Sequence, residues 1–247
     1  MEHKEYKRIC DNSSIAILFI HGIVGTPNHF NKFVSLVPDS ISVYNLLLDG
    51  HGKEVKDFSK TSMKKWELQV TSAVQELSLK HEKIYIVAHS LGTLLAIEQA
   101  IKNQKVYKLF LLAVPLSLSI KPKMPVNSLK VYFDKIRPDD YEALAAKKCY
   151  GIGKDKNIFN YIGWIPRFFE LFSKIRQTRK TIILLNTTCS VYQSGKDEMV
   201  SRRSKNYLVS NPSILVNELK KSGHYYYDEE DFEFLITEFK KMLNMNS

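Results

Sequence analysis

The sequence has few cysteines and lacks a long uncharged apolar segment. Cys10, Cys149 and Cys189 are odd in number, widely spaced and without a C-x-x-C pair, which argues against a disulfide framework and against a structural zinc site. The simple interpretation is a reducing, cytoplasmic location. No stretch reaches the roughly 18 apolar residues of a membrane-spanning helix. The first apolar run, residues 15–20, is too short for a signal peptide.

Acidic residues are scarce relative to basic ones, with 26 Asp+Glu against 36 Lys+Arg and a formal net charge of +10. Residues 115–180 carry most of this excess, because they hold 14 Lys+Arg and only 6 Asp+Glu. The basic residues are scattered and follow no nucleic-acid-binding motif, so we expect no nucleic-acid partner. Hydrophobic residues make up 44% of the chain, which excludes a disordered protein and is enough for one folded domain over residues 1–247.

Short apolar runs alternate with amphipathic stretches along most of the chain. This alternation is typical of an α/β fold, with a mostly parallel central sheet flanked by helices. The predicted strands cover residues 15–20, 41–48, 83–88, 106–114, 187–193 and 213–219. The predicted helices cover residues 62–80, 92–104, 201–208 and 228–243. Residues 115–180 interrupt the pattern with aromatic and basic helical fragments, and a block of this length predicts an inserted cap or lid.

A candidate nucleophile lies between a predicted strand and a predicted helix, in Ala88-His-Ser90-Leu-Gly92. A serine in such a turn projects from the top of the sheet, provided that the residues two before and two after it are small. The usual pattern is G-x-S-x-G, and here Ala88 replaces the first glycine with one additional methyl group. The alternative interpretation is an ordinary turn in which Ser90 caps the helix.

A serine hydroxyl needs a base and an acid that orients the base, and on this kind of sheet they follow in the order Ser, acid, His. His224 lies between the last predicted strand and helix and is the candidate base, the alternative being a surface or helix-capping histidine. Asp197 follows the penultimate strand after a glycine turn and is the candidate acid. Glu198 is the alternative acid.

Two backbone amides are the candidate donors to the oxyanion of an acyl-transfer reaction. One belongs to Leu91, directly after the nucleophile, and the other to Ile23, in the turn after the first predicted strand. Gly22 and Gly25 let this turn approach a substrate closely. His21 is interpreted as a residue that braces the turn by hydrogen bonding rather than as a catalytic base.

Five motifs together resemble those of bacterial carboxylesterases and monoacylglycerol-lipase-like enzymes, in the same order along the chain. They are His21-Gly22-Ile23, Asp49-Gly50-His51-Gly52, His89-Ser90-Leu91-Gly92, Gly195-Lys196-Asp197 and Ser222-Gly223-His224. The resemblance covers nearly the whole chain outside residues 115–180 and implies the α/β-hydrolase fold. Ala88 at the first elbow glycine and Asp49, where proline often precedes Gly-His-Gly, depart from the pattern without removing a catalytic atom.

The sequence therefore predicts a serine hydrolase of carboxylic esters, with short or medium acyl chains or of the monoacylglycerol type, that needs no metal or organic cofactor. Gly22, Val24, His89, Trp164 and Phe168 are the candidate substrate-binding residues. A thioesterase or acyltransferase with the same three residues is an alternative, and a non-catalytic basic binding module is another.

The basic, aromatic block over residues 115–180 allows two interpretations. One is an apolar cap floor with a solvated basic face, and the other is a lid that makes transient contact with an anionic lipid surface. The first interpretation is favoured, and no oligomeric state is predicted from the sequence.

Overall fold

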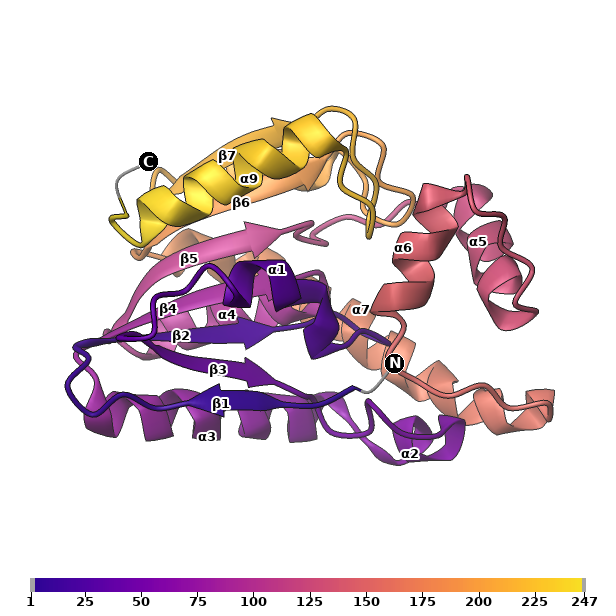
Figure 1. Cartoon of the computed structure of the whole chain (residues 1–247), viewed down its shortest axis with the longest axis horizontal. Coiled ribbons are helices and arrows are strands. Elements are labelled where there is room, and N and C mark those ends of the chain that lie inside the picture. Colours follow the sequence, from indigo (N-terminus) through magenta and orange to yellow (C-terminus); the bar gives the residue numbers. More distant parts are fainter. Residues whose placement is uncertain (1–2, 246–247) are drawn as a thin grey trace.

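The computed structural model describes residues 3–245. At its centre is a seven-stranded sheet with the order β1-β3-β2-β4-β5-β6-β7 (Figure 1). The strands are β1 (Tyr6–Arg8), β2 (Ile15–Ile20), β3 (Ser42–Leu46), β4 (Lys83–His89), β5 (Val106–Leu112), β6 (Thr188–Ser194) and β7 (Ile214–Leu219). Strand β1 pairs antiparallel with β3, and the other neighbouring strands are parallel. The predicted α/β class with a mostly parallel sheet is confirmed.

The six predicted strands correspond to β2 through β7, with ends that shift by a few residues. Strand β1 was not predicted, because Tyr6, Lys7 and Arg8 are not buried and have no apolar pattern. Its backbone simply adds an antiparallel edge to β3, where Lys7 lies opposite Tyr44.

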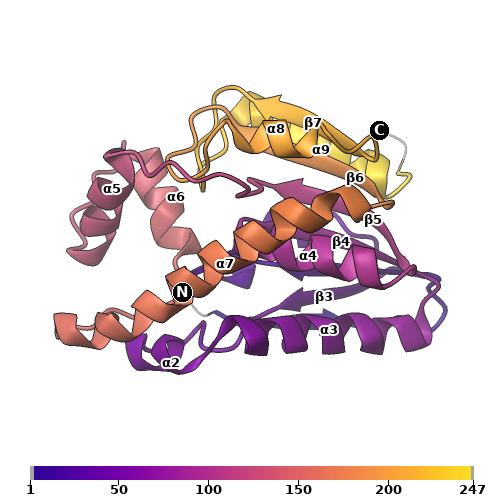
Figure 2. The ribbon, with the colours of Figure 1, turned by 180° about the vertical axis from the view of Figure 1, so that it is seen from behind.

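Helices cover both faces of the sheet. In Figure 1 the short α1 and the long α9 lie in front of the strands, and Figure 2 shows α3, α4, α7 and α8 on the opposite face. The helices are η1 (Pro27–Phe30), α1 (Asn31–Val34), α2 (Val55–Lys60), α3 (Met63–Lys80), α4 (Leu91–Lys102), α5 (Lys123–Tyr132), α6 (Tyr141–Cys149), η2 (Ile158–Trp164), α7 (Ile165–Thr181), η3 (Ile182–Leu184), α8 (Ser204–Leu208) and α9 (Glu229–Met242).

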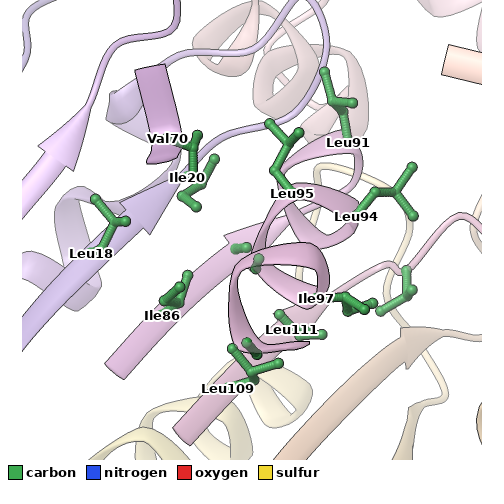
Figure 3. Packing of buried hydrophobic residues seen from close by; sticks show 14 of the residues in the cluster. Leu18, Ile20, Val70, Ile86, Leu91, Leu94, Leu95, Ile97, Leu109 and Leu111 are labelled. Atoms are coloured by element: carbon green, nitrogen blue, oxygen red, sulfur yellow. The ribbon is translucent and has the colours of Figure 1, made fainter. Parts of the chain in front are cut away.

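Side chains of alternate strand residues point to opposite faces of the sheet and form two separate hydrophobic cores. Leu18 and Ile86 point to the face covered by α3 and α4, and they belong to the same hydrophobic cluster as Leu95 of α4 (Figure 3). Phe19 and its neighbours on the other face pack against Phe239 of α9. Each such fully buried side chain stabilises the fold by about 1.5–3 kcal/mol, and together they fix the strand register that places the loops at the sheet edge.

The block over residues 115–180 divides into two parts. Helices α5 and α6, together with η2 and the start of α7, extend beyond the carboxyl ends of the strands (Figures 1 and 2). The second half of α7 belongs to the sheet-covering layer, because Leu171 and Ile175 are buried in the core that α4 shares. The first part, which lies beyond the strand ends, is referred to below as the cap. Within residues 3–245 no helix combines the length and apolarity needed to cross a bilayer.

Candidate active site

Ser90 occupies a strained turn between β4 and α4. Its backbone has φ 51° and ψ −121°, a conformation that a residue with a side chain adopts only where the surrounding structure enforces it. A Cβ on Gly92 would lie 2.2 Å from the carbonyl oxygen of Ile20, so position 92 must be glycine. Ala88 is fully buried, so the fold accommodates its methyl group within the core.

His224 and Asp197 meet at the ends of β7 and β6. His224 Nδ1 lies 2.9 Å from Asp197 Oδ2 and 3.2 Å from Oδ1, and both side chains are buried. Asp197 Oδ1 also accepts the backbone N–H groups of Met199 and Val200, at 2.8 and 2.7 Å. The carboxylate is therefore fixed by three donors and can hold the imidazole ring in one orientation.

The electrostatics of this pair favour the charged forms of both groups. Burial would raise the pKa of Asp197, but the charge and hydrogen bond of His224 and the two backbone amides outweigh burial and lower the pKa. Burial would lower the pKa of His224, but Asp197, with a contribution from Glu198, outweighs burial and raises the pKa. An imidazolium formed at His224 is thus stabilised where it stands.

Glu198, the alternative acid, points elsewhere. Its Oε2 atom accepts the backbone N–H of His224 at 3.0 Å, and the side chain is buried. Glu198 therefore holds the main chain of the histidine, whereas Asp197 holds the ring.

The second ring nitrogen of His224, Nε2, has no hydrogen-bond partner in the described part of the chain. Nε2 is buried and makes no hydrogen bond to any atom of residues 3–245, Ser90 Oγ included. The two residues are nevertheless linked through His89, which directly precedes Ser90. The ring of His89 lies 4.7 Å from that of His224, and its Nε2–H donates to the His224 carbonyl at 3.0 Å. In an unliganded site a nucleophile–base contact is often long, and it tightens when a substrate binds.

The backbone amides of Ile23 and Leu91 are available to a ligand. Leu91 is the first residue of α4, so its N–H has no acceptor within the helix. In the turn after β2, the Val24 N–H donates to His51 Nε2 at 3.1 Å and the Gly25 N–H to the Gly22 carbonyl at 3.0 Å. Among residues 3–245, no hydrogen bond from the Ile23 amide is found. The Ile23 amide is therefore an open donor of the turn.

His21 and His51 hold this turn in place through hydrogen bonds to its backbone. His21 Nε2 accepts the Leu48 N–H at 3.1 Å, so its Nδ1–H donates to the Gly22 carbonyl at 2.9 Å. His51 Nε2 accepts from Val24, and its Nδ1–H lies 3.2 Å from the Leu48 carbonyl. Burial lowers the pKa of both rings, to about 4 for His51. Both are therefore neutral, each with a fixed tautomer, at neutral pH.

A large apolar cavity of about 1010 Å³ lies between the cap segments. Its floor includes Ile23 and Val24 from the turn and Tyr225 beside His224, while Trp164 and Phe168 contribute from the cap side. The other two predicted substrate-binding residues, Gly22 and His89, are not among the residues that line this cavity. A Cβ on Gly22 would be 2.9 Å from Ser90 Cβ, and His89 packs between His29 and His224 at 4.2 and 4.7 Å.

Sequence reasoning missed His29 and Tyr225, and it named Glu198 only as an alternative acid, without its contact with the His224 main chain. The amide contact of Glu198 spans 26 positions, and the stacking of His29 on His89 spans 60, so neither has a local signal. Tyr225 could have been suspected only from its position next to His224. Within residues 3–245 no three His, Cys, Asp or Glu side chains are grouped so as to hold a metal ion.

Comparison with known proteins gives one family and several structural likenesses. A sequence model of the alpha/beta hydrolase family matches residues 17–237. Among curated protein sequences, none matches this chain.

Three solved structures illustrate the likeness of fold. A metagenome-derived lipolytic enzyme has a TM-score of 0.73 at 13% identity, over 99% of this chain and 98% of the other. The monoacylglycerol lipase of Paleococcus ferrophilus has a TM-score of 0.70 at 16% identity, over 100% of both chains. The N-formylmaleamic acid deformylase of Pseudomonas putida S16 has a TM-score of 0.62 at 14% identity, over 94% of both.

Proposed function

Because the chain belongs to the alpha/beta hydrolase family, we propose that it is a serine hydrolase that cleaves carboxylic esters through an acyl-enzyme on Ser90. The observation that carries this proposal is the buried Asp197–His224 pair. Its unpartnered Nε2 belongs to a ring that packs on His89, the residue directly before the strained Ser90. The lipolytic enzyme and the monoacylglycerol lipase of similar fold support the choice of an ester.

In the proposed reaction the Ser90 hydroxyl oxygen attacks the ester carbonyl carbon while His224 Nε2 takes the hydroxyl proton. The ester C–O bond then breaks, and the imidazolium returns the proton to the departing alcohol oxygen. Water attacks the acyl-enzyme in the same way and releases the acid. The Ile23 and Leu91 amides face the oxyanion in each step, and each would lower the barrier by about 3–4 kcal/mol.

The first test is covalent labelling by a fluorophosphonate, which reacts with activated serine hydroxyls. We expect the wild-type protein to be labelled and the Ser90→Ala protein to remain unlabelled, with equal unfolding midpoints as the control for folding. Labelling that persists in Ser90→Ala contradicts the assignment. A series of p-nitrophenyl esters from acetate to dodecanoate then measures the acyl length that the cavity prefers, with short and medium chains expected to react fastest.

Transfer of the acyl group to another acceptor, or cleavage of a thioester, uses the same residues. Added alcohol or amine acceptors would then lower the yield of free acid without lowering total turnover. A non-catalytic binding module, by contrast, is unaffected by Ser90→Ala and loses affinity steeply with salt.

The cap surface supports contact with an anionic lipid surface during turnover. Ile158 and Phe159 in η2 are 74% and 73% exposed, and Phe169 on α7 is 66% exposed, within a block rich in Lys and Arg. Apolar side chains among cations are the composition that binds interfaces with anionic headgroups. Activity on vesicles that does not rise with the anionic lipid fraction would contradict this contact.

The three free thiols support a cytoplasmic location.

A further inference from the structure

Two cavities share part of their lining beside the candidate site, and this shared part is called their junction below. The large apolar cavity of about 1010 Å³ lies within the cap, and a smaller one of about 450 Å³ lies between α6, η1 and the loop before α9. Lys148 and Tyr225 line both of them. Tyr225 packs edge-on against His224 with ring centres 4.8 Å apart, so the junction of the cavities adjoins the candidate base.

The lining of the large cavity is apolar, yet its charged residues are all cationic. Lys147, Lys148 and Lys154 line it, and no carboxylate does. Lys147 is paired with Asp134 at 2.6 Å, and Lys154 lies 4.0 Å from the same carboxylate. The ammonium of Lys148, an exposed residue of α6, makes no ion pair or hydrogen bond with any of residues 3–245. At the junction, Lys148 therefore supplies a positive charge with no partner in the part of the chain that the structure describes.

Lys148 is held close to the catalytic side of the molecule by its neighbour. Cys149 Sγ lies 3.3 Å from His29 Nδ1, and the ring of His29 stacks on His89 at 4.2 Å, directly before Ser90. Burial, then the charges of His224 and Lys148, lower the pKa of His29 to about 3. The charge of Lys148 therefore acts on the ring of His29, which stacks on His89, the residue directly before Ser90.

We propose that the substrate is an acyl ester whose polar part carries a phosphate or carboxylate group, and that Lys148 binds this anion where the two cavities meet. This proposal rests on the proposed ester hydrolysis. The acyl chain lies in the large apolar cavity, where each buried methylene contributes about 0.8 kcal/mol. The ammonium donates a charge-assisted hydrogen bond to the anion. A neutral ester accepts only a weaker hydrogen bond from the same ammonium.

The first experiment measures binding without catalysis. Octyl phosphate, nonanoate and octanol are titrated against the fluorescence of Trp164, which lines the cavity. We expect at least one of the two anions to bind at least about fivefold more tightly than octanol, and which of them does so identifies phosphate or carboxylate. Lys148→Gln should abolish the difference and Lys148→Arg should retain it.

Lys135→Gln is the matched control, because Lys135 is an exposed lysine of the same block that lines neither cavity. It removes the same charge and should leave the preference intact. Equal affinity for the three compounds in the wild-type protein overturns the proposal. So does an equal loss of preference in Lys135→Gln and Lys148→Gln.

The second experiment compares kcat/KM for 1-octanoylglycerol and for its 3-phosphate, which differ only by the anionic group. The proposal predicts a preference of about fivefold or more for the phosphate ester, which is reduced toward unity in Lys148→Gln and kept in Lys135→Gln. Equal wild-type rates on the two esters overturn this proposal alone. Hydrolysis of neither ester overturns the proposed function, while the binding titration still decides whether Lys148 holds an anion.

Discussion

Glu198 Oε2 accepts the backbone N–H of His224 at 3.0 Å, so a second buried carboxylate lies next to the Asp197–His224 pair. Its negative charge contributes to the raised pKa of His224, after Asp197. The two acids are neighbours in the sequence but act on different parts of the histidine. Asp197 contacts the ring nitrogen, and Glu198 contacts the main chain.

Glu198→Gln should shift the acidic limb of the pH profile. The amide oxygen still accepts the His224 N–H, but the charge that helps raise the pKa of His224 is gone, so that pKa falls. Since the proposed base must be neutral to take the Ser90 proton, activity should persist to lower pH. The pH dependence of kcat/KM measures this, with Glu218→Gln, an exposed acid on β7, as the control. An unchanged acidic limb would show that Glu198 acts only through its hydrogen bond.

Asp197→Asn should lower kcat about 10⁴-fold with little change in KM. If the Asn side-chain amide donates to Nδ1, the imidazole proton moves to Nε2, and the base can no longer accept from Ser90. Glu198 cannot replace the lost acid because it faces the main chain. Steady-state kinetics on a p-nitrophenyl ester checks this. A loss in Glu198→Gln equal to that in Asp197→Asn would contradict the division of roles.

Gly92→Ala should destabilise the fold by about 3 kcal/mol, because its methyl group would lie 2.2 Å from the Ile20 carbonyl oxygen in the tightest packing of the elbow. Ala88→Gly, two residues before the serine, is the matched change in the opposite direction. It removes one buried methyl group and should lower the free energy of unfolding by only about 1 kcal/mol. Urea denaturation measures both, and similar losses in the two variants would mean that the turn tolerates a Cβ at position 92.

The local chemistry of the elbow explains why much of the site could be predicted. A buried strand, small residues at Ala88 and Gly92 and a following helix are all consequences of steric crowding within a few residues of Ser90. Strand ends in a parallel sheet meet at one edge, so Asp197 and His224 could be expected there from the order of the elements alone.

What could not be predicted depends on contacts that no local pattern encodes. Strand β1 lacks buried residues, and its pairing with the backbone of β3 has no local signal in the sequence. The contact of Lys148 with two cavities, and the stack of His29 on His89, depend on how the cap folds back over the sheet. The amphipathic pattern of α7 likewise does not reveal that its first turns face the cavity while its last turns cover α4.

Lys174 ties this second half of α7 to the sheet-covering helices and gives the last test. It is 3% exposed and contacts Glu67 of α3 at 2.6 Å as well as Glu98 of α4. Lys174→Met leaves two carboxylates without their shared cation and should lower the free energy of unfolding by about 3 kcal/mol at pH 7. The rate on esters should stay within about twofold, because the residue lines neither cavity.

The sign of the pH dependence follows from Glu98. Burial would raise its pKa, but the ion pairs with Lys102 and Lys174 outweigh burial and lower it below the usual value of 4.5. The ion-pair contribution is therefore complete above pH 4.5 and is lost as the pH falls through the lowered pKa. The gap between the wild-type and Lys174→Met proteins should thus shrink in acid. Urea denaturation at neutral and acidic pH measures this gap, and Lys174→Met combined with Glu98→Gln should recover part of it at pH 7. A gap that stays constant would contradict the ion-pair origin of this stabilisation. Ester activity that falls together with stability would show that Lys174 also supports the candidate site.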